Sequence, residues 1–478
     1  MRIFAPAMKT AETHAITPAD TICAPATAPG GALSVVRVAG PEAIALTDRI
    51  FEPRDGRPLA TRKGYTLAFG YVRRADGSLI DEVVVSLFRT PHSYTGEDAV
   101  EISCHGSTYI VSEVMARLVE AGCRTARPGE FTERAFLNGK MDLSQAEAVA
   151  DLIGATTRAA HQVALSQLRG GFSHELAGLR DRLLHFASLM ELELDFSDHE
   201  DLEFADRTEL LALAGEIETA IGSLVASYRA GNMIKNGVPV AIVGETNAGK
   251  STLLNALLGE DRAIVSDIHG TTRDVIEDTV NLGGVTFRFI DTAGLRQTTD
   301  AVERMGIDRT YTKMEQATIV LWMIDATDLS TAERLLSDIQ AHVDGKTLLV
   351  LFNKCDLLTT AQRQAIATRF TPIGHRQLFL SARNGDNLDE LRHALVEMAS
   401  LPDLAQDAVV VTNARHYEAL RQAASAIHRA SDGLKQNLSG DFVSQDIREC
   451  IYHLSDIAGD VTSDSILQNI FRRFCIGK

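Results

Sequence analysis

The chain has 478 residues, a formal net charge of −17 and 45% hydrophobic residues. One hydrophobic core rarely serves so long a chain, so we expect roughly two to four domains. The acidic balance excludes nucleic-acid binding through the overall field of the protein, because phosphates would be repelled, and any RNA contact needs a local basic patch or a partner.

The N-terminus and the cysteines indicate a cytoplasmic protein. No uninterrupted apolar run approaches the roughly 18 residues of a membrane span, and residues 1–20 lack the apolar core of a secretory signal. We therefore expect a flexible extension there, with Met8 as an alternative start, and no membrane partner. No CxxC pair occurs among Cys23, Cys104, Cys123, Cys355, Cys450 and Cys475. This spacing predicts neither a zinc site nor a disulfide framework, and a reducing compartment fits it.

Residues 21–140 read as a small α+β domain. Short segments rich in β-branched and aromatic residues, at 34–38, 65–72 and 82–88, are separated by turns that contain glycine. Residues 111–119 read as a helix.

Two helical segments are expected on either side of a central block. Proline is absent between Pro128 and Pro239 and again after Pro402, which permits long helices. Apolar residues recur at helical spacing at Leu143, Ala146, Ala150 and Ile153, at Leu179, Leu183, Phe186, Met190 and Leu194, and at Ile447, Ile451, Leu454 and Ala458. We predict one helical domain built from residues 141–236 and 401–478, with an acidic, solvated helix end or loop over 191–209.

The central block, residues 237–400, opens with a phosphate-binding motif. An apolar strand at 238–243 is followed by Gly244-Glu-Thr-Asn-Ala-Gly-Lys-Ser251 and a helix at 252–258. In G-x-x-x-x-G-K-S the glycines let backbone N–H groups converge on phosphate oxygens, Lys250 reaches the β- and γ-phosphates, and Ser251 coordinates Mg²⁺. The strand–loop–helix context disfavours a chance glycine-rich turn.

Three further motifs follow in order, each at the end of a predicted strand. Asp291-Thr-Ala-Gly294 follows a strand at 285–290, and places Asp291 to hold Mg²⁺ through water and the Gly294 N–H to sense the γ-phosphate. Asn353-Lys-Cys-Asp356 gives guanine a carboxylate that accepts two hydrogen bonds, and the backbone of Ser381-Ala-Arg383 can meet the guanine oxygen. Together the motifs predict a doubly wound α/β GTPase with its ligand at the strand ends.

One position departs from Ras-like enzymes. They carry a glutamine after the DTAG glycine to orient the attacking water, and here that residue is Leu295. The water must be oriented by another residue or another molecule. The candidates in this segment are Arg296, Asp300, Glu303, Arg304 and Asp308.

Motifs outside the central block carry a family resemblance over residues 21–478. They are Ser93-Tyr-Thr-Gly-Glu-Asp98, His105-Gly106, Arg127-Pro-Gly-Glu-Phe-Thr-Glu-Arg-Ala-Phe-Leu-Asn138, Lys140-Met-Asp-Leu-Ser-Gln-Ala-Glu147, Gly270-Thr-Thr-Arg-Asp274 and Cys475-Ile-Gly-Lys478. With them the chain resembles the tRNA-modification GTPase family known as TrmE or MnmE. The resemblance implies an N-terminal domain that binds tetrahydrofolate and dimerises, a helical domain, and a Ras-like P-loop GTPase domain inserted within the helical one.

The resemblance also implies an activity. Such a homodimer works with an FAD-dependent partner of the MnmG (GidA) type, in a heterotetramer. Together they build a carboxymethylaminomethyl-type group at C5 of the wobble uridine of tRNA, with carbon from 5-formyl- or methylene-tetrahydrofolate. The folate contacts implied are Arg37, Glu101, Lys140 and Lys478. Cys475 would be a catalytic-type cysteine, and the alternative is a half-buried thiol in a helical tail with Ile466, Ile470 and Phe474.

For the nucleotide site the resemblance implies a potassium ion against the phosphates, where a fixed cation offsets developing charge. Its ligands would be Asn247, Ser266, Ile268 and Thr271; Thr272 would join Ser251 on Mg²⁺, and Glu303 would orient water. The implied GTP contacts are Asn247, Ala248, Gly249, Lys250, Ser251, Thr252, Ser266, Asp267, Ile268, His269, Gly270, Thr271, Thr272, Asp291, Thr292, Ala293, Gly294, Asn353, Lys354, Asp356, Ser381, Ala382 and Arg383. Two residues depart from the family pattern: this chain has Thr246 where the family usually has proline, and Ser266 where the family has threonine.

Two other functions compete with this interpretation. One is a regulatory or ribosome-assembly GTPase without modification chemistry of its own, and the other is a metabolic folate-binding protein with a nucleotide switch. Ribosome-assembly relatives usually add a KH domain with a GxxG loop or a second GTPase domain. Residues 401–478 contain no GxxG, and the phosphate-loop motif occurs once.

Overall fold

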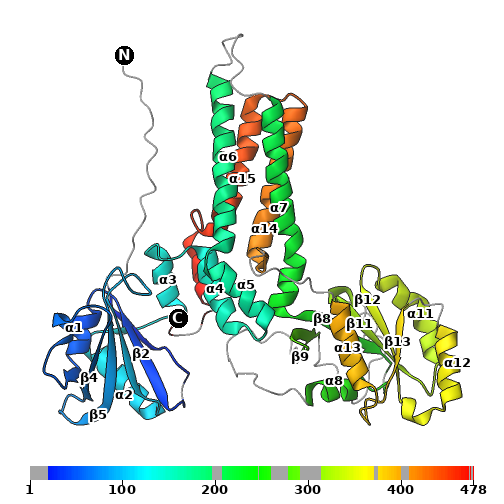
Figure 1. Ribbon diagram of the computed structural model, residues 1–478, viewed down its shortest axis with the longest axis horizontal. Helices are drawn as coiled ribbons and strands as arrows, with labels where there is room; N and C mark the ends of the chain where they lie inside the picture. Colours follow the sequence, from blue (N-terminus) through cyan, green and yellow to red (C-terminus); the bar gives the residue numbers. More distant parts are fainter. Residues whose placement is uncertain are drawn as a thin grey trace. The chain divides into compact units, whose positions relative to one another are not determined.

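A computed structural model of the chain describes residues 20–28, 30–195, 207–245, 247–259, 278–290, 314–370, 375–399 and 409–472, together with Phe474 and Gly477. Its contacts divide the chain into two compact units, residues 1–150 with 455–478 and residues 151–454 (Figure 1). The finer division into N-terminal, helical and GTPase domains remains a prediction.

The first unit contains a seven-stranded sheet in the order β3-β4-β5-β6-β2-β1-β7. The strands are β1 (Ile22–Pro25), β2 (Leu33–Ala39), β3 (Phe51–Pro53), β4 (Thr66–Arg73), β5 (Leu79–Phe88), β6 (Ala99–His105) and β7 (Arg124–Thr125). All neighbours are antiparallel except β1 and β7. In the β2–β6 register Arg37 stands opposite Glu101.

Helices pack on both faces of this sheet. The unit's helices are α1 (Ala43–Asp48), the short 3-10 turn η1 (Leu59–Thr61), α2 (Thr108–Ala121), α3 (Glu130–Leu137) and α16 (Asp464–Phe471), and α4 (Leu143–Gly154) begins in it. Val114 and Leu118 of α2 pack in one core with Val36, Val85 and Ile102 of the strands. On the other face Phe131 of α3 packs with Ile22 of β1 and Ala39 of β2, whereas over β4 and β5 Leu67, Phe69 and Val84 are exposed. The predicted α+β character of residues 21–140 is confirmed.

The second unit holds a bundle of long helices. They are α5 (Arg158–Leu168), α6 (Gly171–Asp195), α7 (Arg207–Asn236) and α14 (Ala414–Lys435), with most of α15 (Gly440–Ala458). The predicted periodicity is confirmed for Leu179, Leu183, Phe186 and Met190, which are all buried. Ile153, predicted on the apolar face of α4, is instead 43% exposed next to the end of that helix.

Helix α7 is apolar enough over Thr208–Asn236 to pass as a membrane span by length and composition, and 28% of its most apolar window is buried. The sequence analysis expected no membrane span because it looked for uninterrupted apolar runs, and in α7 such a run is interrupted by Glu216 and Glu218. Glu218 bonds Nδ1 of His428 on α14 at 2.8 Å, and Leu210, Ile217 and Leu224 form a buried stripe seven residues apart. These contacts are those of a bundle helix, and the absence of a membrane partner remains a prediction.

A doubly wound sheet lies in the chain between α7 and α14. Its strands β8 (Val238–Gly244), β9 (Asp278–Leu282), β10 (Val285–Phe289), β11 (Ile319–Asp325), β12 (Thr347–Asn353) and β13 (Arg376–Phe379) take the order β13-β12-β11-β8-β10-β9. All pairs are parallel except the β9–β10 hairpin. The parallel order places the C-terminal ends of β8, β11 and β12 along one edge.

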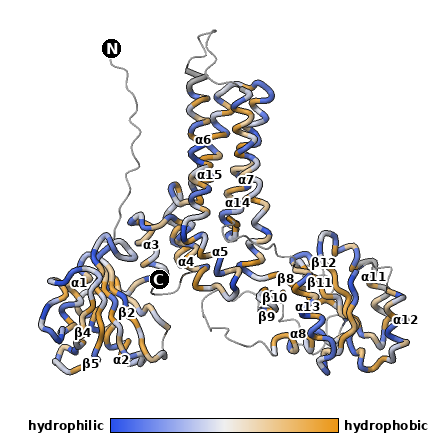
Figure 2. The backbone as a smooth tube through the Cα atoms, viewed as in Figure 1, coloured by the Kyte–Doolittle hydropathy of each residue, from blue (hydrophilic) through white to orange (hydrophobic). Residues whose placement is uncertain are grey.

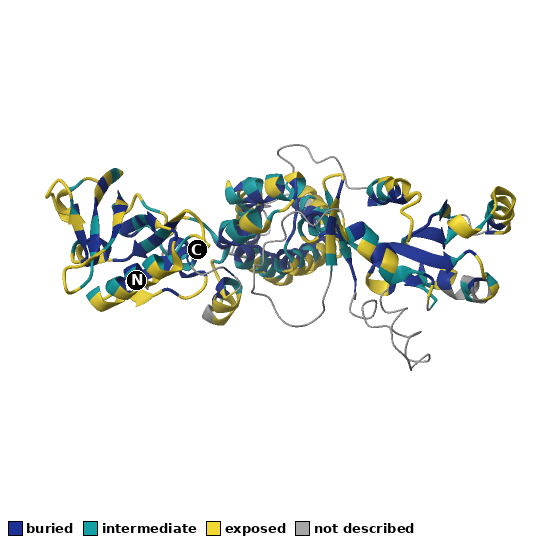
Figure 3. Cartoon of the chain, turned by 90° about the horizontal axis from the view of Figure 1, so that it is seen from below, coloured by how far each residue is buried: buried dark blue, intermediate teal, exposed yellow. Residues whose placement is uncertain are grey.

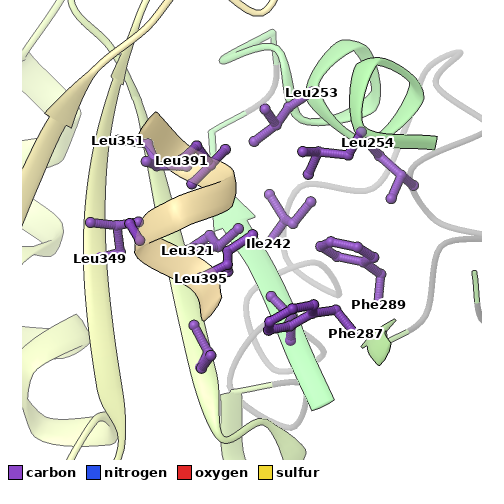
Figure 4. Packing of buried hydrophobic residues seen from close by; sticks show 14 of the residues in the cluster. Ile242, Leu253, Leu254, Phe287, Phe289, Leu321, Leu349, Leu351, Leu391 and Leu395 are labelled. Carbon is purple, nitrogen blue, oxygen red and sulfur yellow. The ribbon is translucent and has the colours of Figure 1, made fainter. Parts of the chain in front are cut away.

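Helices bury both faces of this sheet. They are α8 (Lys250–Gly259), α11 (Ser330–His342), α12 (Thr360–Phe370) and α13 (Leu388–Ala399). On one face Leu349 and Leu351 pack near Leu391 and Leu395 of α13 (Figure 4). Strands buried on both faces read as continuous apolar runs, and the central strands β8, β11 and β12 are accordingly hydrophobic in Figure 2 and buried in Figure 3.

The chain leaves the helical bundle after α7 and returns to it before α14, and these two segments are in contact. Val411 donates its N–H to Oγ of Ser227 on α7 at 3.0 Å, and Nε2 of Gln167 donates to the carbonyl of Val410 at 2.9 Å. A β-carbon on Gly231 would lie 2.2 Å from the Val411 carbonyl oxygen, so glycine permits the two backbones to touch. The segments before β8 and before α14 are therefore held together.

Candidate functional site

The loop between β8 and α8 has the backbone of a phosphate-binding loop. Gly244 has a φ of +146°, and a β-carbon there would lie 2.1 Å from the carbonyl oxygen of Met323. Gly249 has a φ of +101°, and its β-carbon would lie 2.3 Å from Nδ2 of Asn353. Asn247 is also left-handed, with a φ of +68°. Left-handed residues at these positions curl the backbone into the concave form that gathers N–H groups on an anion.

Lys250 and Ser251 form the first turn of α8. Nζ of Lys250 donates to the carbonyl oxygens of Gly244, at 2.8 Å, and Glu245, at 2.5 Å. Its ammonium group therefore lies over the loop, where phosphate oxygens would compete for it. Ser251 stands at the helix N-terminus, as a Mg²⁺ ligand after a phosphate loop must.

Asn353 joins the phosphate loop to the third loop of the site. Its side chain is buried, with Nδ2 donating to the carbonyl of Ala248 at 2.7 Å and Oδ1 accepting from the N–H of Ala382 at 3.0 Å. The N–H of Cys355 donates to the Leu380 carbonyl at 3.2 Å. The three loops after β8, β12 and β13 are therefore fixed relative to one another by hydrogen bonds.

The base-recognition turn is the 3-10 helix η2 (Cys355–Leu357), which exposes Asp356. Lys354 precedes it with a left-handed φ of +63°. Its Nζ lies 2.5 Å from Oδ2 of Asp325, the last residue of β11. Burial opposes ionisation of Asp325, but hydrogen bonds from Lys354 and Thr327 outweigh it, so the pKa of Asp325 is lowered. The sequence interpretation missed Asp325, whose signal was a carboxylate at the end of an otherwise apolar strand.

Several predicted residues of the nucleotide site lie outside the described part of the chain. They are Thr246, Ser266, Asp267, Ile268, His269, Gly270, Thr271, Thr272, Asp291, Thr292, Ala293, Gly294, Leu295, Arg296, Asp300, Glu303, Arg304 and Asp308. Their roles remain predictions. Strand β10 nevertheless ends at Phe289, two residues before Asp291, and the N–H of Ile290 donates to the Val240 carbonyl at 3.0 Å.

A second site lies in the sheet of the first unit. Arg37 of β2 donates through Nε to Oε1 of Glu101 on β6 at 2.9 Å, and its Nη2 lies 2.8 Å from the same oxygen. The rings of Tyr94 and Phe131 each stand 5.6 Å from the Arg37 guanidinium carbon. The pair is half-buried, with side-chain exposures of 16% and 29%.

The loop between β5 and β6 completes this second site. Nζ of Lys140 donates to the carbonyl of Pro91 at 3.0 Å, and the Tyr94 hydroxyl lies 2.9 Å from Oγ1 of Thr132. Burial raises the pKa of Tyr94. The structure thus brings Arg37, Glu101 and Lys140 to one region of the unit. Lys478 and Cys475 lie outside the described residues, whereas Gly477, between them, accepts a hydrogen bond from Nη1 of Arg37 at 3.2 Å.

The six-stranded doubly wound sheet, its phosphate loop and the Asn353–Asp356 segment define a guanine-nucleotide-binding P-loop protein. Family models extend this class over the chain: the GTP-binding protein TrmE N-terminus matches residues 21–140, and the MnmE helical domain matches residues 143–475. The chain belongs to the MnmE family of tRNA modification GTPases.

Curated relatives support the same assignment over nearly the whole chain. The tRNA modification GTPase MnmE of Bacteroides fragilis is 61% identical over 464 residues, which cover 96% of this chain and 99% of the relative. Its counterpart in Bacteroides thetaiotaomicron is 60% identical with the same coverage, and that of Christiangramia forsetii is 47% identical over 472 residues, again with 96% and 99% covered. The predicted GTPase activity in tRNA modification and the predicted fold class are therefore confirmed.

Proposed function

We propose that the chain is a potassium-dependent, cytoplasmic GTPase that helps to build a carboxymethylaminomethyl-type group at C5 of the wobble uridine of tRNA. It would act with an FAD-dependent partner of the MnmG (GidA) type in a heterotetramer, and take a carbon from 5-formyl- or methylene-tetrahydrofolate. Family membership supports GTP and tRNA as ligands. The observation that carries the proposal is a second site around Arg37 and Glu101, distinct from the nucleotide loops.

On the nucleotide side, the phosphate loop supplies the positioning. Lys250 would exchange its two carbonyl contacts for phosphate oxygens, and Ser251 and Thr272 would hold Mg²⁺. Asn247 is exposed on the loop, where its amide oxygen fits a cation ligand together with Ser266, Ile268 and Thr271. A potassium ion there would offset charge that develops on the transferred phosphoryl group.

On the folate side, the groups present suit a pterin with an anionic glutamate tail. Arg37 contacts Glu101 through Oε1 only, and no described residue bonds Oε2 of Glu101. This second carboxylate oxygen can therefore accept hydrogen bonds from pterin N–H groups. Lys140, with Lys478, would meet carboxylates, and Tyr94 offers an aromatic surface beside Arg37. Arg37 itself would orient Glu101 through their ion pair.

The exposed sheet face supports a homodimer. Phe69 and Val84 stand opposite each other in the β4–β5 register, and both are exposed, at 40% and 38%. Leu67 is 68% exposed on the same strand. A contiguous apolar face of this kind is typical of an association surface.

Potassium dependence tests the nucleotide half of the proposal. Hydrolysis should be much faster in KCl than in NaCl at equal ionic strength, because only an ion of fitting size bridges Asn247 and the phosphates. Asn247→Ala should lose most of this difference. Equal wild-type rates in the two salts would remove the potassium site from the mechanism.

The tRNA nucleoside profile of a deletion strain separates the competing functions. We expect loss of the wobble modification, restored by the wild-type gene but not by Lys140→Ala. An unchanged profile would favour a regulatory or ribosome-assembly GTPase. Binding of reduced folate with an unchanged profile would favour a metabolic folate protein.

A further inference from the structure

The loop that connects β3 to β4 is basic in an otherwise acidic chain. The whole chain carries a net charge of −17, so it can bind RNA directly only where cations are locally in excess. Residues 54–65 have such an excess, and we call this segment the basic loop. It contains four cationic residues and one acidic residue, namely Arg54, Arg57, Arg62 and Lys63 with Asp55.

Hydrogen bonds give the basic loop a defined shape. The carboxylate of Asp48 accepts from the first two N–H groups of η1, at 2.7 and 2.9 Å. Arg62 pairs with Asp55, and its Nη2 also donates to the carbonyl of Arg57 at 2.9 Å. Because these contacts already order the loop, a ligand that binds it has little conformational entropy left to remove.

Two cations of the basic loop remain available to a ligand. Arg57 and Lys63 are exposed, and among the described residues neither charged group has a hydrogen-bond or ion-pair partner. Arg73, at the end of β4, shows the contrast, because it pairs with Glu52. An unpaired cation gives up only water when it meets a phosphate, whereas a paired one must also give up its carboxylate. Arg57 and Lys63 are therefore suited to bind phosphate.

Tyr65, the last residue of the basic loop, exposes an aromatic ring. The residue is 72% exposed, and its φ of +59° is left-handed, a conformation that bulky residues seldom adopt. Its N–H donates to the Leu87 carbonyl at 2.7 Å. Its ring meets Phe88 edge to face, with the ring centroids 5.8 Å apart. The ring is thus held in place and open to solvent, as a surface on which an unpaired RNA base can stack.

Contacts of Arg89 and Phe88 connect the basic loop to the second site. Arg89 donates through Nη2 and Nε to two carbonyls of the basic loop, at 2.8 and 3.1 Å, and its Nη1 lies 3.9 Å from Oδ2 of Asp98. Asp98 ends the β5–β6 loop of the second site. Phe88 packs in one cluster with Phe131, whose ring flanks Arg37. RNA on the basic loop would therefore lie beside the region where the one-carbon chemistry is proposed.

We infer that the basic loop binds the anticodon loop of tRNA. Arg57 and Lys63 bind its phosphates, and Tyr65 stacks on one of its unpaired bases. Single-stranded RNA fits this surface because its bases can leave the stack, which paired bases cannot do. A second copy of the chain fits it poorly, since two basic loops would repel each other. The choice of the anticodon loop rests on the proposed function, whereas RNA binding by the basic loop does not.

The test measures binding of a fluorescein-labelled anticodon stem–loop RNA to the full-length protein by fluorescence anisotropy, between about 50 and about 200 mM KCl. Arg57→Ala and Lys63→Ala should each weaken binding roughly threefold and lower the slope of log affinity against log salt by roughly 0.7, the value for one phosphate contact on a single strand. Arg73→Ala makes the same charge change in the same unit and is the control. Equal weakening by Arg73→Ala, or no measurable binding by the wild type, would overturn the inference.

Tyr65 is tested by a variant that keeps its backbone conformation. Tyr65→Asn removes the ring, and asparagine tolerates a left-handed φ. We expect binding to weaken roughly fivefold or more with an unchanged salt slope, because a neutral ring releases no counterions. Tyr65→Phe should bind like the wild type. Sedimentation velocity follows the oligomeric state, and a loss of binding that appears only with a change in that state would overturn the inference.

The tRNA nucleoside profile separates the inference from the proposed function. In the deletion strain a gene with both Arg57→Ala and Lys63→Ala should restore less wobble modification than a gene with Arg73→Ala. If the variants lose binding of the stem–loop but the deletion strain keeps its modification, the RNA surface stands and the proposed function fails. If the deletion removes the modification but the variants bind and modify like the wild type, the proposed function stands and the role of the basic loop fails.

Discussion

Oδ2 of Asp325 lies 2.5 Å from Nζ of Lys354, and this ion pair ties the end of β11 to the residue before the base-recognition turn. Asp325 and Asn353 are opposite each other in the parallel ladder, and the N–H of Ala326 donates to the Asn353 carbonyl at 3.1 Å. The left-handed Lys354 then turns its side chain back across β11. Asp325 therefore fixes the direction in which the turn leaves the sheet and presents Asp356.

Asp325→Asn should weaken the binding of both GTP and GDP. The side chains of Asp325 and Lys354 are 21% and 35% exposed, so solvent screens the pair and we expect a cost of about 1 kcal/mol, or roughly fivefold in affinity. The amide keeps an acceptor for Thr327, so the turn after β11 should persist. Single-turnover hydrolysis at saturating GTP should stay near wild type. Asp328→Asn, in the same loop, is the control, and equal losses in both variants would contradict a specific role.

Asp356→Asn should move base preference from guanine toward xanthine, whose 2-oxo group suits an amide donor. Because an unpaired buried polar group is costly, we expect the GTP-to-XTP affinity ratio to change by roughly 10²-fold or more. Competition binding measures the ratio, and Asp389→Asn on α13 serves as a control of equal charge change. Wild-type protein that binds ATP as well as GTP would show that the Asn353–Asp356 segment does not select guanine.

Glu303→Ala should slow GTP hydrolysis by roughly 10²-fold or more, the effect typical of losing one acid–base or positioning group. Leu295 cannot orient water, and a carboxylate in this segment can accept a hydrogen bond from it. Nucleotide affinity should barely change, because the residue acts on the water. Single-turnover hydrolysis in KCl is compared with Asp308→Ala. Near wild-type hydrolysis by Glu303→Ala would move the assignment to Asp300.

Glu130→Gln should destabilise the first unit by about 3 kcal/mol, because it removes a buried carboxylate that pairs with the buried Arg134 and the partly exposed Arg124. Glu130 is 1% exposed and accepts from Nη1 of Arg124 at 3.0 Å, the Arg127 N–H at 2.7 Å and Nη2 of Arg134 at 3.2 Å. Hydrogen exchange of α3 peptides in increasing urea measures the change. The control is Glu120→Gln, an exposed glutamate of α2 that is paired with Arg117.

The pH dependence of this difference has a definite sign. Burial opposes ionisation of Glu130, but hydrogen bonds from Arg124 and Arg127 outweigh it, so its pKa is lowered from the usual 4.5. The contribution of its charge is therefore fully present above pH 4.5, and it is lost as pH falls through the folded-state pKa. The gap between wild type and Glu130→Gln should be constant from pH 6 to 8 and shrink below 4.5. A gap that grows in acid would contradict the ion-pair account.

The nucleotide site was largely predictable because its motifs sit at strand ends. The predicted strands at 238–243 and 285–290 match β8 and β10 within a residue, and Lys250 begins α8. Strand β11 was not predicted, since nothing in its apolar run marks chemistry. The bond between Asp325 and Lys354 crosses from β11 to β12, and pairing between strands far apart in sequence cannot be read from spacing.

In the first unit the sequence predicted strands near β2, β4 and β5 and the helix α2, but not β6 or α3. Strand β6 carries Glu101 and Ser103 among its apolar residues, and α3 begins after the left-handed Gly129. Tyr94 and Phe131 lay in motifs that carried the resemblance, yet neither received a role. Their contact with Arg37 depends on tertiary packing across β2, α3 and the β5–β6 loop.

The junction of Ser227, Gly231 and Val411 makes the nucleotide-binding segment separable in a physical sense. Since the chain departs after α7 and comes back beside it, residues 238–409 lie between two segments, at Gly231 and Val411, whose backbones are in contact. A few glycine and serine residues could span that gap in their place at little entropic cost. We expect such a shortened protein to keep α7 and α14 paired. It would then be a form of the protein that retains the N-terminal unit and the helical bundle but cannot bind GTP.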